Sequence, residues 1–240
     1  MRWIKDTTGR FPERPFYSLE ELDDLSESWI LGFLLDRYGQ TDFPVSTEDL
    51  TVMIESETSD LDQFADLTAE EEDGEEVQGM TVFYRDKQPA VKISQHLASQ
   101  NQREHRLRTT LTHEFGHVKL HCGLWQFEQL SLFPELGSDP GPRCKRAEML
   151  NAPRTDWMEW QAGYISGAVL MPVTHLKELV HAAFREWGAV GSITINSTEA
   201  TTLQERVAAR FSVSIDAARV RLSQLGFVVE GNRVSPPRLT

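Results

Sequence analysis

The sequence predicts a mainly helical α+β protein with one small β-sheet. Apolar residues recur at helical spacing in several long stretches, and capping signals precede them. The segment 77–94 instead combines β-branched and aromatic residues with near-alternation, which is typical of strands. A chain of 240 residues with 40% hydrophobic and 25% charged residues is long enough to bury a sizeable core. We therefore expect a larger domain over 1–190 and a C-terminal subdomain over 191–240.

Composition excludes several classes of function. The net charge of −13 argues against broad coating of nucleic acid or of an anionic membrane, although a local basic surface remains compatible with it. No apolar run approaches the ~18 residues that a membrane span needs, and the first residues have no apolar export core. The two cysteines, Cys122 and Cys144, fit a reducing compartment. We expect a cytoplasmic protein without membrane contact.

The N-terminal third predicts two helices among irregular segments. Residues 1–17 contain prolines and mixed charge and are expected to form an irregular arm. Ser18 and Ser46 each begin a capping pattern, the first ahead of a helix over 19–38 and the second ahead of a short helix. Residues 60–76 contain nine acidic residues and no basic one. That run predicts a self-repelling loop, and a site for a divalent cation or a basic partner is the alternative.

Two strands follow, over 77–84 and 90–94, and a turn at 85–89 joins them into a predicted hairpin. An exposed edge of such a hairpin can hold an extended peptide substrate as an added strand. A purely structural hairpin is an equally good interpretation of this segment.

The stretch 103–121 predicts one helix, and it contains His113-Glu114-Phe115-Gly116-His117, an H-E-x-x-H motif. On a helix, His113 and His117 stand one turn apart on the same face, where they can share a Zn²⁺ ion. Glu114 beside them can act as a general base toward a metal-bound water. Gly116 in mid-helix predicts the close passage of another backbone or of the substrate.

Beyond the motif, residues 122–156 are rich in glycine and proline and predict a long functional or mobile loop. A helix over 157–171 follows, with small residues that permit close packing against another helix, and Pro172 ends it. Thr174 is the expected cap of the next helix, through Trp187, with Gly188 as its stop.

The C-terminal segment predicts two helices, over 203–211 and 215–225, at helix-turn-helix spacing with Ser214 as the cap of the second. Residues 201–240 contain six arginines and three acids, a local charge of +3. Arg219 and Arg221 would lie on the second helix, where they are compatible with weak DNA contact. A small packing subdomain is the alternative.

A catalytic zinc site needs a third protein ligand. His121 lies eight residues after His113, about 12 Å along a helix axis, so one ion cannot bind both. A metzincin would need histidine six residues after His117, and Gly123 stands there. Glu159 remains, although an acidic residue in the first turn of a helix is also favoured by the helix dipole alone.

The stretches HEFGHVKLH and EWQAGYISGAVLMP together resemble the ImmA/IrrE family of zinc metallopeptidases. The resemblance implies a zincin-like domain with His113, His117 and Glu159 as zinc ligands and Glu114 as general base. It also implies a helix-turn-helix-like C-terminal subdomain. Gly163, where the family more often has asparagine, and Ser166 depart from the family pattern, but neither is a ligand position.

By the same resemblance, the expected function is a zinc-dependent endopeptidase whose substrate is a DNA-binding repressor. Its cleavage would switch on stress or mobile-element genes. Tyr164, on the same predicted helix as Glu159, is the candidate hydrogen-bond donor to the transition state. The alternative is a non-proteolytic, metal-binding transcriptional regulator that acts through its C-terminal helix-turn-helix. A structural zinc site is disfavoured because no fourth ligand is evident.

Overall fold

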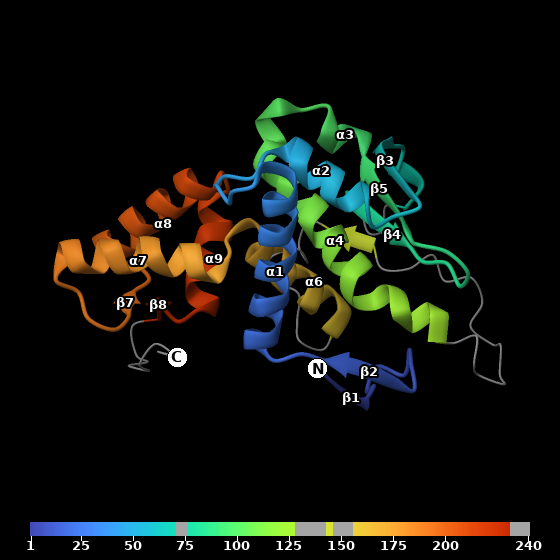
Figure 1. Ribbon diagram of the computed structural model, residues 1–240, viewed down its shortest axis with the longest axis horizontal. Coiled ribbons are helices and arrows are strands. Elements are labelled where there is room, and N and C mark those ends of the chain that lie inside the picture. Colours follow the sequence, from blue (N-terminus) through green and yellow to red (C-terminus); the bar gives the residue numbers. More distant parts are fainter. Residues whose placement is uncertain (71–75, 128–142, 146–155, 231–240) are drawn as a thin grey trace. The chain divides into compact units, whose positions relative to one another are not determined.

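The chain divides by its internal contacts into two units. The computed structural model describes all residues except 71–75, 128–142, 146–155 and 231–240 (Figure 1). The first unit comprises Met1–Leu25 and Ser46–Ser166, and the second comprises Ser26–Val45 and Gly167–Thr240. The predicted division into domains at residue 190 groups the chain differently and stays a prediction.

A four-stranded sheet lies in the first unit and confirms the α+β prediction. Its spatial order is β3 (Asp60–Ala65), β5 (Ala90–Ser94), β4 (Val77–Val82) and β6 (Arg143–Lys145). Strand β3 runs parallel to β5, whereas β4 is antiparallel to both β5 and β6. The predicted β4–β5 hairpin is therefore present, with Gly79 opposite Ile93.

Strand β3 corrects the expectation of a loop over the acidic stretch. Its side chains alternate, with Asp60, Asp62 and Phe64 exposed while Leu61 and Ala65 turn inward. A strand places its acidic residues on the solvent face in this way without repulsion in the core. The many acidic residues therefore hid the alternation of exposed and inward-facing side chains that is typical of a strand. Residues 71–75 of the acidic stretch lie outside the described part.

A hairpin also replaces the irregular arm that was expected over 1–17. Strands β1 (Arg2–Lys5) and β2 (Glu13–Phe16) are antiparallel, and Pro15 pairs with Trp3. The carboxylate of Asp6 accepts hydrogen bonds from the backbone N–H groups of Thr8 and Phe11, at 3.0 Å each. A buried carboxylate that satisfies the turn's own donors explains why a proline-containing segment is ordered.

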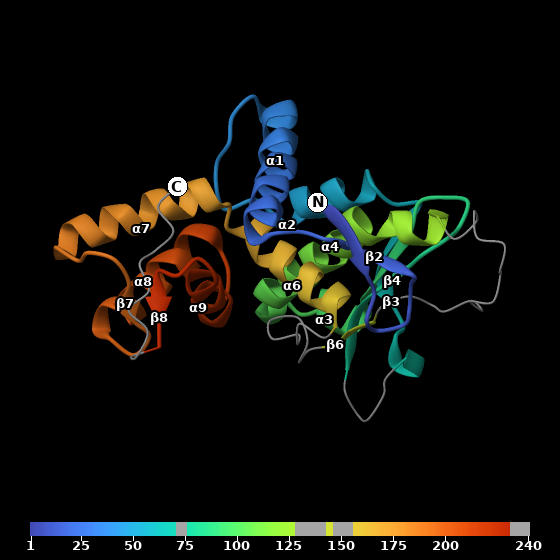
Figure 2. The same ribbon diagram turned by 90° about the horizontal axis from the view of Figure 1, so that it is seen from below.

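Most helices of the first unit were predicted, whereas the short helix over 95–98 was not. The helices are the start of α1 (Leu19–Tyr38), α2 (Thr47–Glu55), α3 (Gln95–Ala98), α4 (Glu104–Phe127) and most of α6 (Trp157–Leu170), with short 3₁₀ turns at Thr68–Glu70 and Asn101–Arg103. The Ser46 side chain caps α2 by accepting from the N–H of Asp49. Helix α4 packs against β4 and β5 and continues six residues past its predicted end at His121 (Figure 2).

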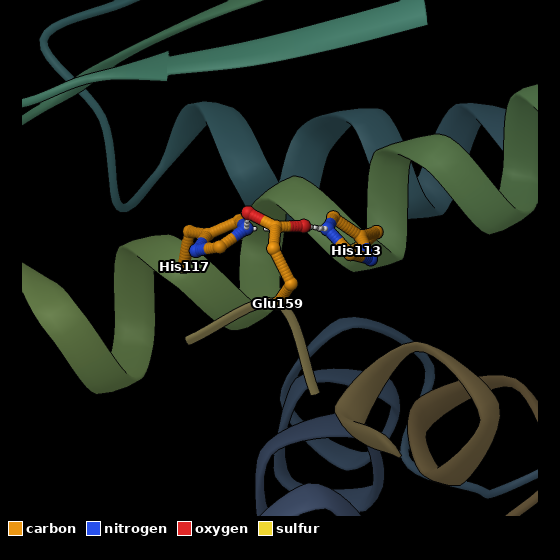
Figure 3. A group of neighbouring side chains, drawn as sticks. All are labelled: His113, His117 and Glu159. Carbon is orange, nitrogen blue, oxygen red and sulfur yellow. Dashed lines mark hydrogen bonds and ion pairs between the residues drawn. The ribbon is translucent and has the colours of Figure 1, made fainter. Parts of the chain in front are cut away.

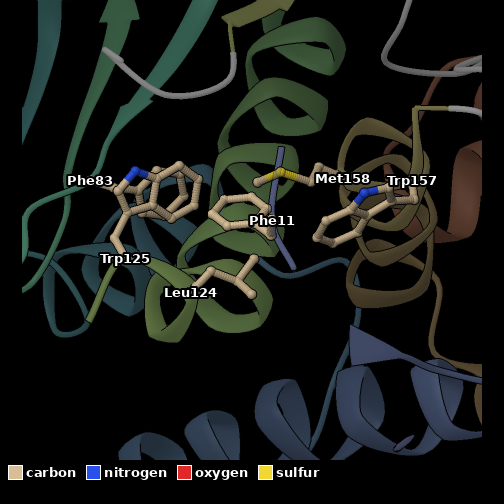
Figure 4. Close-up of a cluster of buried hydrophobic side chains, with 6 residues drawn as sticks. All are labelled: Phe11, Phe83, Leu124, Trp125, Trp157 and Met158. Atoms are coloured by element: carbon tan, nitrogen blue, oxygen red, sulfur yellow. The ribbon is translucent and has the colours of Figure 1, made fainter. Parts of the chain in front are cut away.

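An aromatic cluster joins these elements (Figure 4). Phe11, from the turn of the N-terminal hairpin, meets Trp125 of α4 edge-on at 5.2 Å and Trp157 of α6 at 6.4 Å between ring centroids. Phe83, just after β4, stacks on Trp125 at 3.9 Å. Leu124 and Met158 complete the cluster, and all six side chains are buried. It thus ties the end of α4 to the start of α6.

The second unit is helical. It contains α7 (Val173–Trp187), α8 (Thr198–Phe211), α9 (Ile215–Gln224) and a two-stranded parallel pairing of β7 (Ile193–Thr194) with β8 (Val228–Val229). The caps predicted at Gly188, in the left-handed region, and at Ser214 are present. Thr174 is not the cap of α7. The helix begins two residues earlier, with Pro172 at the cap position, and the N–H of Thr174 donates to Glu27 instead.

Helices α8 and α9 are joined by three residues, as predicted, and α8 begins five residues before its expected start. Their assignment as a helix-turn-helix subdomain stays a prediction. Among the described helices, none is both long enough and apolar enough to cross a membrane.

Gly116 allows α4 and α6 to approach closely within the first unit. A Cβ atom at this position would stand 3.0 Å from the Cα of Ala162 and 3.2 Å from the Cβ of Ile165. The obstacle is largely backbone, which cannot rotate away. The expectation that Gly116 admits another backbone is therefore confirmed.

Replacing Gly116 with valine should lower the free energy of unfolding by about 1–3 kcal/mol, because the new side chain overpacks the helix contact. Gly32, in the second unit, offers a control, since a Cβ there meets no atom of the described residues within 4 Å. Gly32→Ala should raise the free energy of unfolding by up to ~1 kcal/mol through helix propensity. Urea unfolding measures both changes, and a Gly116→Val protein as stable as the wild type would contradict this packing argument.

Candidate metal centre

The H-E-x-x-H residues lie on the buried face of α4. His113, Glu114 and His117 are each 0% exposed. Because His113 and His117 are one helical turn apart, their rings point to the same side, and their Nε2 atoms are 3.1 Å apart (Figure 3). Two ring nitrogens this close can share one cation between them.

Helix α6 adds a carboxylate to this pair. Glu159, in the first turn of α6, is 4% exposed. Its Oε2 atom is 3.0 Å from Nε2 of His113 and its Oε1 atom is 3.2 Å from Nε2 of His117. Figure 3 shows the carboxylate facing both imidazole rings. The close approach at Gly116 puts the two helices near enough for this contact.

The three side chains fit a metal ion. Ligands at the usual Zn–N and Zn–O bond lengths of roughly 2.0–2.1 Å in a tetrahedron stand about 3.3 Å from one another. The separations of 3.0, 3.1 and 3.2 Å in this group are close to that value. Among the described residues, His113, His117 and Glu159 form the one group of three metal-ligating side chains.

The two carboxyl groups near the histidines are shifted in opposite directions. Burial raises the pKa of the Glu114 carboxyl, and the nearby imidazoles of His117 and His113 oppose the shift only in part. Burial also works against ionisation of Glu159, yet His117 and His113 hold the pKa of its carboxyl well below the ordinary value. Ligand carboxylates must be ionised, and a general base works best with a pKa near the operating pH.

Strand β4 holds Glu114 in place. The hydroxyl of Thr81 donates to Oε2 of Glu114 at 2.6 Å. Opposite Oε1 lies Gly79, where a Cβ atom would come within 2.6 Å of that oxygen and 2.8 Å of the Thr110 methyl carbon. The sequence interpretation named neither residue, although a glycine inside a strand is a known signal of close approach.

His121 makes a polar contact rather than a ligand contact, as its distance along the helix implied. Its Nδ1 atom is 3.0 Å from Nδ1 of His117, and its Nε2 atom is 3.0 Å from Oε1 of Gln161. Burial, together with His117, lowers the pKa of His121 to about 3. His121 is therefore neutral under physiological conditions. Gln161 was not identified from the sequence, because its partners His121 and Pro15 are far from it in the chain.

Tyr164 does not donate toward this site. Its hydroxyl is 3.1 Å from each carboxylate oxygen of Asp23, and its side chain is 2% exposed. The hypothesis that Tyr164 is a transition-state donor is therefore wrong. Its hydroxyl instead links α6 to the start of α1 inside the first unit.

The sheet edge next to Glu114 is already occupied. Strand β4 pairs with β5 on one side and with β6 on the other, so the outer strands of the described sheet are β3 and β6. The β4–β5 hairpin therefore does not present the exposed edge that was considered for strand addition. Most of the 122–156 segment lies outside the described residues, apart from the end of α4, strand β6 and residue 156.

The arginines of the C-terminal segment are engaged within the second unit. Arg206 pairs with Glu186, Arg210 with Asp42, and Arg219 with Asp216. Arg221 is 1% exposed and donates to the carbonyl of Met171, so its expected role in phosphate contact is wrong. Arg233 and Arg238 lie outside the described residues. The DNA-contact hypothesis gains no support from the arginines that are described.

Comparison with known proteins identifies a peptidase family whose model covers the candidate metal centre. No curated protein matches the chain. A family model described as the IrrE N-terminal-like domain, Peptidase_M78, matches residues 75–223. This span runs from strand β4 into α9 and includes all four residues of the candidate site, His113, Glu114, His117 and Glu159. The match covers more than half of the 240 residues, and the chain belongs to the ImmA/IrrE family of peptidases.

Proposed function

We propose that this chain is a zinc-dependent endopeptidase that cleaves a regulatory protein. The observation that carries the proposal is the buried group of His113, His117 and Glu159 beside Glu114. The proposed substrate is a DNA-binding repressor of the helix-turn-helix type, whose cleavage would relieve repression in stress or mobile-element control. That part rests on the family resemblance.

Zinc is the metal that this donor set favours. Two imidazole nitrogens and one carboxylate oxygen are the protein ligands of many catalytic zinc sites, which keep a further position open. No fourth cysteine, histidine, aspartate or glutamate joins the group among the described residues. When bound, zinc supplies Lewis acidity, which polarises a carbonyl group and lowers the pKa of water.

Glu114 is the proposed general base. One carboxylate oxygen, Oε2, is fixed by the Thr81 hydroxyl, while the other, Oε1, is buried and has no hydrogen-bond partner among the described residues. An acceptor held open next to the ligand group can take a proton from an attacking water and pass it to the leaving amine. The raised pKa of this carboxyl favours proton uptake.

Replacing Glu114 with glutamine should reduce cleavage by at least about 100-fold, because the amide cannot accept the proton, while zinc remains bound. The measurement is electrophoresis of the repressor-like protein encoded nearest to this gene, after incubation with zinc-loaded enzyme. Glu57→Gln is the matched control. Glu57 accepts a hydrogen bond from Lys119, which lies on the same helix as Glu114, but Glu57 is outside the metal centre.

If Glu114→Gln keeps zinc and still relieves repression while the repressor stays intact, the peptidase proposal is wrong. The protein would then act as the non-proteolytic regulator described by the alternative hypothesis.

Removing the carboxylate of Glu159 tests the ligand set. We expect Glu159→Ala to weaken zinc binding by more than about 100-fold, beyond the range typical of residues that only support a ligand. Competition with a chromophoric chelator measures the affinity, and Glu57→Ala should leave it unchanged. Wild-type affinity in Glu159→Ala would show that Glu159 is not the third ligand of the ion.

The Thr81 hydroxyl should matter for rate rather than for metal binding. Thr81→Val should lower kcat about tenfold or more, since a buried hydrogen bond to a carboxylate is lost, whereas Thr81→Ser should keep most of the activity. Zinc content should be equal in both variants. Equal rates for valine and serine would refute the idea that this hydroxyl positions Glu114.

A further inference from the structure

We infer that His121 and Gln161 form a hydrogen-bond relay that fixes His117 in the tautomer whose Nε2 lone pair faces the metal centre. The inference rests on the metal site of the proposed function, but not on its peptidase activity. His121 and Gln161 are positioning residues in this scheme, because they act through His117.

The relay is an unbroken chain of three contacts inside the first unit. Nδ1 of His117 is 3.0 Å from Nδ1 of His121, and Nε2 of His121 is 3.0 Å from Oε1 of Gln161. The side-chain nitrogen of Gln161 then donates to the backbone carbonyl of Pro15 at 3.1 Å. His117 and His121 are 0% exposed and Gln161 is 2% exposed, so each of these groups depends on its partner in the chain.

The carbonyl of Pro15 sets the direction of the whole relay. A carbonyl oxygen only accepts, so the amide nitrogen of Gln161 must face Pro15 and its oxygen must face His121. The opposite orientation would bring two oxygens to 3.1 Å without a proton between them. The side-chain oxygen of Gln161 is thus an acceptor at Nε2 of His121.

The direction then passes through both imidazoles. A neutral imidazole has one N–H group and one lone pair. Since Nε2 of His121 donates to Gln161, its Nδ1 carries the lone pair and accepts from Nδ1–H of His117. In the neutral His117 ring the remaining nitrogen, Nε2, then carries the lone pair, and it is the atom that lies 3.1 Å from Nε2 of His113 and 3.2 Å from Oε1 of Glu159.

Packing keeps the middle of the relay in register. The ring of His121 meets Trp157 edge-on, with centroids 5.4 Å apart, and Trp157 belongs to the aromatic cluster around Phe11. Pro15 lies in β2 and Phe11 in the turn before it, so the N-terminal hairpin supplies both the terminal acceptor and part of this packing. A ligand tautomer is thereby set by a residue 102 positions earlier in the chain.

The first test reads the tautomer directly. Nitrogen-15 NMR of the metal-free wild-type protein, in a mildly alkaline buffer that keeps imidazoles neutral, should show the ring proton of His117 on Nδ1 and that of His121 on Nε2. A proton on Nε2 of His117 would overturn the inference. This measurement needs no variant and no activity.

The second test removes the relay. We expect Gln161→Leu and His121→Phe each to weaken zinc binding by about 10–100-fold, measured by competition between the zinc ion and a chromophoric chelator. Thr112→Val is the matched control. Thr112 lies on the same helix, is 0% exposed and shares a 2.9 Å hydrogen bond with Ser166, but it takes no part in the relay.

Wild-type zinc affinity in both relay variants would overturn the inference, as would an equal loss in Thr112→Val, because the loss would then reflect general damage to the core. If a relay variant fails to fold, the tautomer of His117 measured in the wild-type protein decides whether the inference holds. A protein that shows this tautomer and these losses but cleaves no repressor would keep the relay and reject the peptidase proposal.

Discussion

The site depends above all on how closely α4 and α6 approach each other. At Gly116 the gap to the backbone of Ala162 is too small for a side chain, since even a Cβ would stand 3.0 Å from the Ala162 Cα. Glu159 lies three residues before Ala162, so the same contact sets how far its carboxylate reaches toward α4. The result is a separation of 3.0–3.2 Å between the carboxylate oxygens and the two imidazoles. A residue without chemistry of its own thus determines whether three ligands can meet.

The polar groups around this contact give two neighbouring carboxylates different surroundings and opposite pKa shifts. Glu159 faces both imidazoles and is held ionised, whereas Glu114 faces β4, receives one hydroxyl and has a raised pKa. This divergence between neighbouring acids is compatible with the roles proposed for them, Glu159 as ligand and Glu114 as base. Gly79 leaves room for the Glu114 carboxylate because it has no side chain, and any Cβ at that strand position would occupy the same space.

Periodicity and capping predicted most helices but not the elements whose order comes from distant contacts. The helix over 19–38 and the strand over 90–94 were predicted with their observed bounds. Strand β3 was missed because its acidic side chains dominate its composition, and the N-terminal hairpin was missed because the Asp6 carboxylate organises its turn. His113, Glu114 and His117 follow from local spacing. Elimination of other ligands left Glu159 with a helix-dipole alternative, and the family resemblance favoured it as ligand, since nothing local marks a contact 42 residues past His117. Thr81 and Gln161 act through similarly long-range contacts.

Charge counted along a segment proved a poor guide to charge on a surface. The +3 of residues 201–240 contains Arg206 and Arg210, whose acidic partners, Glu186 and Asp42, lie outside the segment, and Arg221 is buried. The local excess therefore balances acids elsewhere in the second unit. A DNA-contacting role would require these arginines to leave existing partners, and exposed pairs of this kind are individually weak enough to exchange. The proposed peptidase chemistry needs no such rearrangement, because the side chains proposed as metal ligands already meet inside the first unit. The two hypotheses therefore differ in what they require of the structure. The peptidase hypothesis uses side chains in their present positions, whereas the DNA-contact hypothesis requires arginines to break their present ion pairs first.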